Sequence, residues 1–474
     1  MQNYSLLTDL YQLTMAYGYW KTGLKDHETV FHLFFRKHPF QGGYTIACGL
    51  QPAIDFINHF SFSKDDLDYL ATLTGNDGKP LFAIEFLEYL ESLENTLTVH
   101  GVPEGTVVFP HEPLLRLQGP IILCQLLETP LLNILNFQTL VATKASRIAR
   151  AAQGEPVLEF GLRRAQGVDG GLAASRAAYI GGCAATSNVL AGKMFGIPVK
   201  GTHAHSWVMS FPTEEEAFEE YAKAMPNNCV FLVDTYDTVE GVKNAIEVGK
   251  KLRTEGHEMV GIRLDSGDLA SLSITARKLL DEAGFTDASI VASNDLDEYE
   301  MKTLKEKGAK INVWGVGTRL VTAYDQPALG GVYKLAAIRK PGGDWAYKVK
   351  LSEQAIKVSN PGILNVRRFV ADGQYAGDII FSEEWQPDMC RFETFSGEKI
   401  QQKTDSHQDL LVPVFEKGKM VYPMADIHQI RAIAQAGMRQ FPDSVFAQTS
   451  PETYAVGLEP RLLSFKLELM NRAK

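Results

Sequence analysis

The chain has 474 residues, of which 45% are hydrophobic and 22% are charged, a composition typical of folded enzymes and unlike that of disordered or fibrous proteins. Its 57 acidic residues outnumber its 47 Lys and Arg residues, which gives a formal net charge of −10. This balance excludes a broadly basic surface that would attract nucleic acid or anionic lipid, so any functional basic groups must be local.

The cysteines and the hydropathy pattern indicate the cellular compartment. The five cysteines are odd in number, far apart and never in a CxxC motif, which argues against a disulfide framework or a thiolate zinc site. The N-terminus has no basic leader followed by an apolar run. No uncharged apolar stretch approaches the roughly 20 residues that span a bilayer. We therefore expect a cytoplasmic protein with neither a membrane nor a nucleic-acid partner.

The first 128 residues mix helical and strand patterns. Apolar residues at helical spacing predict a helix over residues 5–20, with Tyr11 beside the main apolar stripe. Over residues 101–127, prolines and glycines separate short β-branched and leucine-rich runs, which predicts a small sheet or open barrel. A long helix is expected over residues 129–152.

From about residue 156, short β-rich runs alternate regularly with amphipathic helices. The predicted strands are residues 157–160, 197–201, 230–233, 260–264, 289–292 and 312–314. Successive βα units of this kind form either a doubly wound sheet or a closed barrel. Because no GxGxxG motif follows a first strand, we favour an α/β barrel.

The last third returns to strands separated by Gly, Pro and Lys, and it ends with helices expected over residues 424–438 and 461–472. The simplest mixed α/β arrangement has a central barrel, residues 129–335, that carries the active site. Residues 1–128 and 336–474 then build a smaller α/β domain from both ends of the chain.

Polar residues follow each of the six predicted strands. In chain order they are Arg163 and Arg164; Thr202, His203, His205 and Ser206; Asp234, Thr235 and Asp237; Arg263, Asp265, Ser266 and Asp268; Ser293, Asn294 and Asp295; and Gly315, Gly317, Thr318 and Arg319. Loops after parallel barrel strands open on one face, so these side chains are expected at one rim. Arginines and glycine-rich turns suit phosphates, and aspartates suit ribose hydroxyls, Mg²⁺ or a developing positive charge.

Two of these loops have both a functional and a structural interpretation. In WGVGTRL, glycines allow backbone N–H groups to approach a phosphate, but the same residues also suit a tight turn between strand and helix. In GIRLDSGDLA, Arg263 and Asp265 lie on one face of a strand, as a binding pair or as a structural ion pair followed by the helix cap Asp268.

The segment GTHAHSW leaves three interpretations open. The HxH spacing of His203 and His205 occurs in metal sites of hydrolytic barrels, although no third and fourth ligand stands out. The two histidines could instead be structural, or one could act as a nucleophile or acid–base group. A metal-dependent hydrolase is therefore an alternative function. A non-enzymatic phosphate-binding or scaffold protein is disfavoured, because all six loops retain reactive side chains.

Several longer segments can be compared with known families. They are LLTDLYQLTMAYGYW, EFGLRRAQGVDGG, GTHAHSWVMSF, FLVDTYD, GIRLDSGDLA, ASNDLDE and VGTRLVTAYDQPALGGVYKL. Together, and in this order from Leu6 to Leu335, they closely resemble the nicotinate phosphoribosyltransferase family. The resemblance implies a type II phosphoribosyltransferase, with an irregular TIM-like α/β barrel joined to a smaller sandwich-like domain in a homodimer.

The resemblance also implies an activity in NAD biosynthesis. Nicotinate and 5-phosphoribosyl 1-diphosphate would give nicotinate mononucleotide and diphosphate, with Mg²⁺ as cofactor and ATP as co-substrate. ATP hydrolysis would be coupled through a phosphohistidine, which corresponds to His205 here and makes that residue the nucleophile towards ATP.

Further roles follow from the resemblance. Tyr11 of the neighbouring subunit and Phe160 would stack on the pyridine ring of nicotinate, and Arg263 with Thr202 would hold its carboxylate. Asp265 would lie near the ribose as a catalytic carboxylate, and Asp234 in the same region or near Mg²⁺ through water. The residues expected to bind phosphoribosyl diphosphate are Arg163, Ser293, Asn294, Gly315, Gly317 and Thr318.

Residues 184–189, AATSNV, bear on substrate choice. Related enzymes that use nicotinamide carry an aspartate in this segment, which can accept a hydrogen bond from a carboxamide. Here no acid is present to repel a carboxylate, so we expect a preference for nicotinate.

Overall fold

The computed structural model describes residues 4–354, 357–385, 387, 391–401 and 404–472, which form a mixed α/β fold in two compact units. Residues 1–140 and 328–474 make up the terminal unit, and residues 141–327 make up the middle unit. The terminal unit contains more residues than the middle unit, whereas the sequence led us to expect a smaller domain from the two ends. No helix in the described ranges has both the length and the apolar character needed to cross a membrane.

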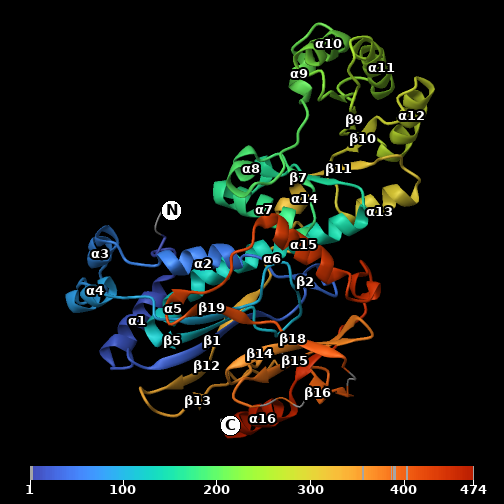
Figure 1. The fold of residues 1–474 in the computed structure, drawn as a ribbon. Helices are drawn as coiled ribbons and strands as arrows, with labels where there is room; N and C mark the ends of the chain where they lie inside the picture. The colour runs from blue at the N-terminus through green and yellow to red at the C-terminus, as the bar shows by residue number, and fades with distance from the viewer. Residues whose placement is uncertain (1–3, 355–356, 386, 388–390, 402–403, 473–474) are drawn as a thin grey trace. The chain divides into compact units, whose positions relative to one another are not determined.

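The described residues of the middle unit contain a six-stranded sheet in which every neighbouring pair is parallel (Figure 1). Its spatial order is β7 (Ala185–Thr186), β6 (Val157–Glu159), β11 (Val313–Val316), β10 (Ser289–Ala292), β9 (Gly261–Leu264) and β8 (Val230–Leu232). A parallel order of this kind brings the carboxyl ends of all the strands to the same edge of the sheet.

Helices separate these strands in sequence. They are α7 (Gly167–Gly181), α8 (Val189–Phe195), α9 (His205–Met209), α10 (Glu214–Ala224), α11 (Thr238–Thr254), α12 (Leu269–Glu282), α13 (Glu298–Glu306) and α14 (Thr318–Val321), with a 3₁₀ turn, η2, at Leu162–Arg164. The long helix α6 (Glu128–Ala151) begins in the terminal unit and ends in the middle unit. Its bounds lie within one residue of the predicted helix.

Five of the six predicted strands are present within two residues of their expected ends, and one expectation is wrong. Residues 197–201 do not form a strand. They make only an isolated bridge, between Val199 and Thr186. Pro198, which has no N–H group to donate, interrupts this segment. The two-residue strand β7 was not predicted, because its small residues give no β-rich run.

The outer strands of this sheet are β7 and β8. No ladder joins β7 to β8 in the part of the chain that the structure describes, so closure into a barrel stays a prediction. The observed architecture is a parallel sheet with helices packed against it, among them α7 against β6 and α12 against β9 and β10.

Helix caps fix the loops that leave this sheet. The Asp237 carboxylate accepts a hydrogen bond from the Glu240 N–H at 2.9 Å, and Asp268 accepts one from the Ser271 N–H at 3.5 Å. Of the two caps, the one at Asp268 was predicted from the sequence. Both caps satisfy N–H groups at the first turn and so set the point at which each loop ends.

The terminal unit is built on antiparallel pairing. Its described residues form a seven-stranded sheet in the order β13 (Ala346–Tyr347), β12 (Gly331–Arg339), β1 (Glu28–Phe35), β5 (Leu115–Pro120), β3 (Thr98–Gly101), β19 (Val412–Glu416) and β20 (Lys419–Met420). A second sheet has the order β17 (Lys399–Gln401), β16 (Arg391–Thr394), β21 (Val456–Leu458), β15 (Gln374–Ser382), β14 (Leu364–Ala371) and β18 (Ser406–Asp409), in which only β15 and β21 pair in parallel. A short ladder joins β2 (Thr45–Ile46) to β4 (Val107–Val108).

The helices of the terminal unit confirm most of the predicted ones. They are α1 (Leu10–Lys21), α2 (Leu50–His59), α3 (Lys64–Ala71), α4 (Ile84–Glu91), α5 (Ile121–Leu126), α15 (Ile427–Met438) and α16 (Pro460–Arg472), with 3₁₀ turns η1 (Pro39–Gln41) and η4 (Asp443–Phe446). Helix α1 begins at Leu10, later than predicted. Helix α5 replaces a predicted β-rich run, because all six of its residues are buried and a continuous apolar run does not distinguish a buried strand from a buried helix.

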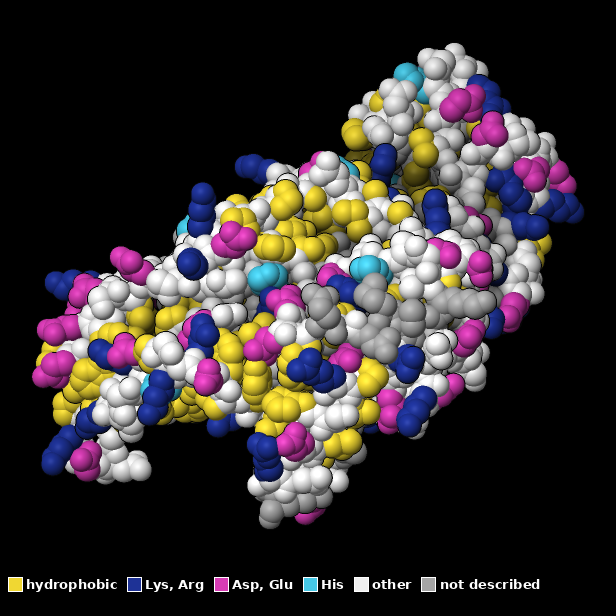
Figure 2. Space-filling model, turned by 60° about the horizontal axis from the view of Figure 1, so that its bottom comes forward, with side chains coloured by type: hydrophobic (Ala, Val, Ile, Leu, Met, Phe, Trp, Pro, Cys, Tyr) yellow, Lys and Arg dark blue, Asp and Glu magenta, His cyan; other side chains and the backbone are white. Residues whose placement is uncertain are grey.

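The distribution of charged side chains on the surface and the state of the cysteines agree with what the composition indicates. On the face in Figure 2, Lys and Arg side chains are interspersed with Asp and Glu side chains instead of forming one large basic area. Cys48, Cys124, Cys183 and Cys229 are buried and none of them is in a disulfide. Cys390 lies outside the described residues.

A buried ion pair joins the two longest strands of the second sheet. Arg368 on β14 donates from Nη2 to Asp378 Oδ2 on β15 at 2.6 Å, and both side chains are almost completely buried. The Tyr454 hydroxyl also donates to Asp378, at 2.9 Å. Burial and the neighbouring Asp378 charge raise the pKa of the adjacent Glu112 well above its usual range.

Replacing Arg368 with Met is expected to lower the free energy of unfolding by about 3–5 kcal/mol, because it leaves the Asp378 carboxylate buried without its cation. Urea unfolding followed by circular dichroism measures the loss. The control is Arg472→Met, because Arg472 is an exposed arginine of the same unit that pairs with Glu468 on α16. Equal unfolding midpoints for the two variants would contradict the prediction.

Candidate active site

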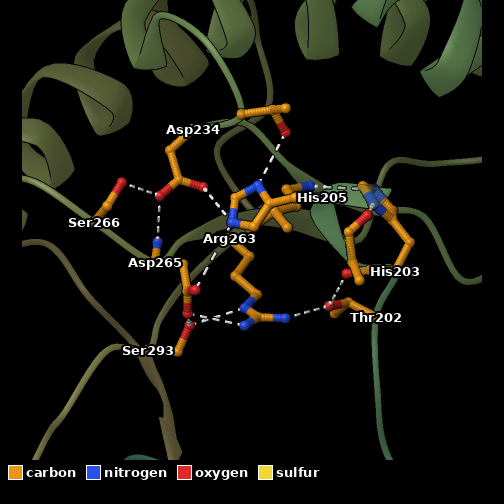
Figure 3. Close-up of polar contacts among 11 residues, drawn as sticks. Thr202, His203, His205, Asp234, Arg263, Asp265, Ser266 and Ser293 are labelled. Atoms are coloured by element: carbon orange, nitrogen blue, oxygen red, sulfur yellow. Dashed lines mark hydrogen bonds and ion pairs between the residues drawn. The ribbon is translucent and has the colours of Figure 1, made fainter. Parts of the chain in front are cut away.

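One guanidinium brings together three loops of the middle unit (Figure 3). Arg263 on β9 donates from Nε to Ser293 Oγ at 2.8 Å, from Nη1 to Thr202 Oγ1 at 3.1 Å and from Nη2 to Asp265 Oδ1 at 2.9 Å. Ser293 follows β10, Asp265 follows β9, and Thr202 follows the bridge-forming residues 197–201. The fixed fork of an arginine is suited to this arrangement, because each N–H group points in a set direction.

Asp265 remains ionised within this cluster. Burial alone would raise the pKa of its carboxyl group, but the hydrogen bond from the Ser293 hydroxyl and the positive charge of Arg263 outweigh burial and lower that pKa below its usual value. The carboxylate is therefore available as a fixed negative charge at neutral pH.

Asp234 contributes a second carboxylate whose side chain is fully buried. Its Oδ2 accepts hydrogen bonds from the Asp265 N–H at 2.9 Å and from Ser266 Oγ at 2.5 Å. Its Oδ1 has no hydrogen-bond partner in the described chain and lies 4.0 Å from His205 Nε2. A buried carboxylate oxygen without a partner is a group that a cation or an additional donor would satisfy.

His205 faces these two carboxylates from the first turn of α9. Its Nε2 lies 3.8 Å from Asp265 Oδ2, and its Nδ1 lies 3.1 Å from Thr235 Oγ1. The side chain is 40% exposed, so a ligand can reach the ring. An accessible imidazole oriented by a hydroxyl and two carboxylates can act as a nucleophile or as an acid–base group.

His203 occupies a different environment on the other side of His205 (Figure 3). It is buried, and its Nε2 accepts a hydrogen bond from the Leu232 N–H at 3.2 Å. Burial lowers the pKa of His203 to about 4. The two histidines therefore do not present a matched pair of ligands. The described residues contain no group of three or more His, Cys, Asp or Glu side chains that could hold a metal ion.

Phe160 follows β6 and lies beneath Arg263. The guanidinium carbon is 5.9 Å from the centre of the Phe160 ring. A Cβ atom at Gly315 would lie 2.8 Å from Phe160 Cδ2, and one at Gly317 would lie 3.1 Å from the Phe160 carbonyl oxygen. Gly315 on β11 and Gly317 directly after it thus allow this part of the chain to pack closely against Phe160. Thr318 is the first residue of α14, directly after this loop.

The loop after β10 has unusual backbone angles. Asn294 and Asp295 have φ values of 100° and 41°, in the left-handed region that favours glycine. Strain of this kind often marks a functional loop. Asp297 holds the loop in place, since its carboxylate accepts from the Tyr299 and Glu300 N–H groups, each at 2.9 Å, and also from Arg319.

Glu159 is a site residue that the sequence analysis missed. It is buried on β6 and accepts hydrogen bonds from the Gly161 N–H, from Ser175 Oγ at 2.8 Å and from Thr186 Oγ1 at 2.5 Å. It therefore ties the loop containing Phe160 to the segment 184–189. The available signal was a carboxylate in an otherwise apolar strand, VLEF, followed by serine and threonine residues that could donate to it.

Two predicted residues are not members of this hydrogen-bonded cluster. Arg163 is on η2, is exposed, and makes no hydrogen bond or ion pair with the described residues. Tyr11 lies on α1 in the terminal unit, where its side chain is about half exposed. The roles of both residues stay predictions.

Comparisons with known proteins cover nearly the whole chain. Family models described as the N-terminal domain, the family proper and the C-terminal domain of nicotinate phosphoribosyltransferase match residues 6–136, 157–345 and 365–466. A Bacillus subtilis nicotinate phosphoribosyltransferase is 44% identical over 99% of this chain and 96% of its own length. A human nicotinate phosphoribosyltransferase is 36% identical over 96% of this chain and 95% of its own length.

Solved structures of other proteins share the fold of this chain. A crystal structure of human nicotinic acid phosphoribosyltransferase superimposes with a TM-score of 0.84 and 32% identity, covering 98% of this chain and 99% of that one. A nicotinate-nucleotide pyrophosphorylase from Pyrococcus furiosus shares the fold, with a TM-score of 0.70 and 21% identity over 92% of this chain and 96% of that one.

The different environments of the two histidines can be measured. At pH 6.5, diethyl pyrocarbonate is expected to modify His205 and to spare His203, whose ring is neutral but buried with its Nε2 engaged. Peptide mass spectrometry after short exposure quantifies both sites, and the exposed His407 serves as a fully reactive reference. If His203 were modified as fast as His407, its ring could not be buried with its Nε2 engaged by the Leu232 N–H.

Proposed function

The chain belongs to the nicotinate phosphoribosyltransferase family, and we propose that it converts nicotinate and 5-phosphoribosyl 1-diphosphate to nicotinate D-ribonucleotide and diphosphate in NAD biosynthesis. The observation that carries this proposal is the convergence of Thr202, Asp265 and Ser293 on Arg263, beside Phe160. This cluster combines a cation and a hydroxyl for a carboxylate, an aromatic surface for a pyridine ring, and an anion for a developing positive charge.

The nicotinate site follows from the position of Arg263. Its guanidinium can donate to the carboxylate of nicotinate, and the Thr202 hydroxyl can do so if it turns away from the His203 carbonyl oxygen to which it donates here. The nearby Phe160 ring offers a face for stacking. Tyr11 of a partner subunit would cover the other face of the pyridine, as the family resemblance implies.

This proposal includes a homodimer, a closed barrel and a cytoplasmic location.

The chemical step is a displacement at the anomeric carbon of ribose. The pyridine nitrogen forms a bond to this carbon as its bond to the diphosphate oxygen breaks, and positive charge develops on the ribose ring. Asp265, whose pKa is lowered, supplies a fixed negative charge for this state. Arg163, Ser293, Asn294, Gly315, Gly317 and Thr318 are the candidates to hold the phosphates.

Asp234 and Asp265 fit the Mg²⁺ that such a reaction requires. The test is the buried Asp234 Oδ1, which is an oxygen of the type that Mg²⁺ prefers, directly or through water, and has no partner in the described chain. When bound, Mg²⁺ would offset the negative charge of the diphosphate. Asp234 itself accepts from the Asp265 N–H and so also orients the catalytic carboxylate.

The ATP-dependent, ligase-type coupling is assigned to His205. A neutral ring nitrogen can attack the γ-phosphorus of ATP, forming a P–N bond as the P–O bond to ADP breaks, and water later cleaves the phosphohistidine. The accessible ring and its hydroxyl partner Thr235 support this role.

Substrate choice is attributed to residues 184–189. Thr186 donates its hydroxyl to Glu159, and the Asn188 N–H donates to Thr186 Oγ1 at 3.0 Å. The segment itself carries no acid, and Glu159 already accepts three hydrogen bonds. No free carboxylate from this segment would therefore repel nicotinate.

The activity itself is tested with nicotinate, nicotinamide and quinolinate in separate assays, each with phosphoribosyl diphosphate and Mg²⁺, with and without ATP. Nicotinate is expected to give its mononucleotide, faster with ATP. Chromatography of the nucleotide products distinguishes the three substrates. A preference for nicotinamide would defeat the selectivity argument, and no product from any substrate would defeat the proposed function.

His205→Ala is expected to abolish ATP hydrolysis coupled to transfer and to retain a slower basal transfer, because the bond-forming nitrogen is lost while Arg263 and Asp265 remain. Phosphate release and nucleotide formation are measured in parallel. The control is His407→Ala, which removes an exposed histidine of the other unit. Undiminished ATP hydrolysis in His205→Ala would assign the phosphorylated group elsewhere.

Arg263→Ala is expected to raise the KM for nicotinate by about 10-fold to 100-fold, the cost of losing charged hydrogen bonds. The KM for phosphoribosyl diphosphate should rise less, since its proposed ligands lie mainly on other loops. Lys278→Ala, at an exposed position on α12, is the matched control and should change neither value. A larger effect on phosphoribosyl diphosphate would reassign Arg263.

A further inference from the structure

His203 takes no part in the chemistry proposed above, yet it is buried next to the loop residues that do. We propose that His203 is a positioning residue that fixes the loop carrying Thr202 and His205, and so sets both nicotinate binding and ATP coupling. This inference rests on the proposed function of those two residues.

The first contact is a backbone anchor. The Leu232 N–H at the end of β8 donates to His203 Nε2 at 3.2 Å, so Nε2 must carry a lone pair and not a proton. The ring proton then lies on Nδ1, which points towards the Ala204 carbonyl oxygen at 3.4 Å. Both ring nitrogens are therefore used within the fold, and His203 holds its own loop to the neighbouring strand.

The second contact is aromatic packing on α10. The His203 ring lies edge-on to Tyr221, with 4.8 Å between ring centres, and 6.0 Å from Phe218. Trp207 packs on Tyr221 as well, with 5.7 Å between ring centres, and its Nε1 donates to the Ala217 carbonyl at 3.0 Å. Residues 203 and 207 thus both attach to α10, and His205 lies between these two anchors.

The anchored segment carries two groups of the site. Thr202 Oγ1 donates to the His203 carbonyl oxygen at 3.2 Å and accepts from Arg263 Nη1. Ala204 is the N-cap of α9, which begins at His205. Release of His203 would therefore displace Thr202 and His205 together. Asp234, Asp265 and Ser293 lie on other loops and would keep their places.

This geometry predicts a selective kinetic effect. His203→Phe keeps an aromatic ring on α10 but removes the acceptor for the Leu232 N–H. Loss of a hydrogen bond to a buried donor corresponds to a change of about tenfold. We expect the KM for nicotinate to rise, and the stimulation by ATP to fall, by about that factor, with the KM for phosphoribosyl diphosphate unchanged. His203→Gln, whose side-chain oxygen can accept the same hydrogen bond, should restore most of the loss.

Tyr221→Phe is the matched control, because it keeps the ring that packs on His203 and changes only its hydroxyl. It should leave all three kinetic values as in the wild type. Equal losses in His203→Phe and His203→Gln, in proportion to a lowered melting temperature, would indicate a purely structural role and overturn the proposal. If His203→Phe does not fold, His203→Asn replaces it, since its shorter amide cannot reach Leu232. Identical kinetics for the Asn and Gln variants would then overturn the proposal.

A readout that needs no substrate separates this inference from the proposed function. The rate at which diethyl pyrocarbonate modifies His205 reports the position and accessibility of that ring. This rate should change in His203→Phe and return to the wild-type value in His203→Gln. An unchanged rate in His203→Phe overturns the positioning role. Failure of the wild-type protein to make nicotinate mononucleotide would instead overturn the proposed function, whatever the modification rates show.

Discussion

The site depends on the way a single arginine, Arg263, is held at the edge of a parallel sheet. Its three hydrogen bonds reach Thr202, Asp265 and Ser293, which come from three separate parts of the edge. A parallel sheet supplies this convergence because all its strands end on the same side, and a guanidinium supplies fixed directions in which to donate. The Ser293 hydroxyl also donates to Asp265, and the Asp265 N–H donates to Asp234, so the loops are linked to one another as well as to the arginine. Arg263 adds a cation at the centre of the surface that they form.

Around that cation, acidic groups are held in distinct states. Asp265 is kept ionised by Ser293 and Arg263, whereas Asp234 is buried with one oxygen occupied and the other unpartnered in the described chain. The net charge of −10 belongs to the whole chain and does not show that a guanidinium lies among these carboxylates. His205 faces this cluster with a partly exposed ring, whereas His203 is buried against α10. The same residue type thus serves two purposes that only its surroundings distinguish.

Much of this arrangement was predictable, and the exceptions have physical causes. The alternation of β-rich runs and capped helices predicted the strands of the middle unit, and parallel topology predicted that polar residues after them would share an edge. The proximity of Asp234 to Asp265, which follow β8 and β9, agrees with that rule, whereas His205 follows residues 197–201, which form only an isolated bridge. Sequence could not distinguish His203 from His205, because the difference arises from the distant Leu232 N–H and the rings of α10. The helix α5 and the strand β7 were missed because neither has a diagnostic periodicity. Glu159 was missed because its donors lie on α7 and β7, far along the chain.

Glu159 has a consequence for how specificity can evolve. Its carboxylate accepts the Thr186 hydroxyl at 2.5 Å inside a buried network, directly beside the segment to which we attribute the choice between an acid and an amide substrate. An acidic residue introduced at position 186 would lose that donor and put two carboxylates in contact, so one of them would have to take up a proton or be replaced. A change of substrate preference by this route is therefore epistatic, because it requires compensation at position 159. A protein that carried only the new acid at position 186 would be destabilised.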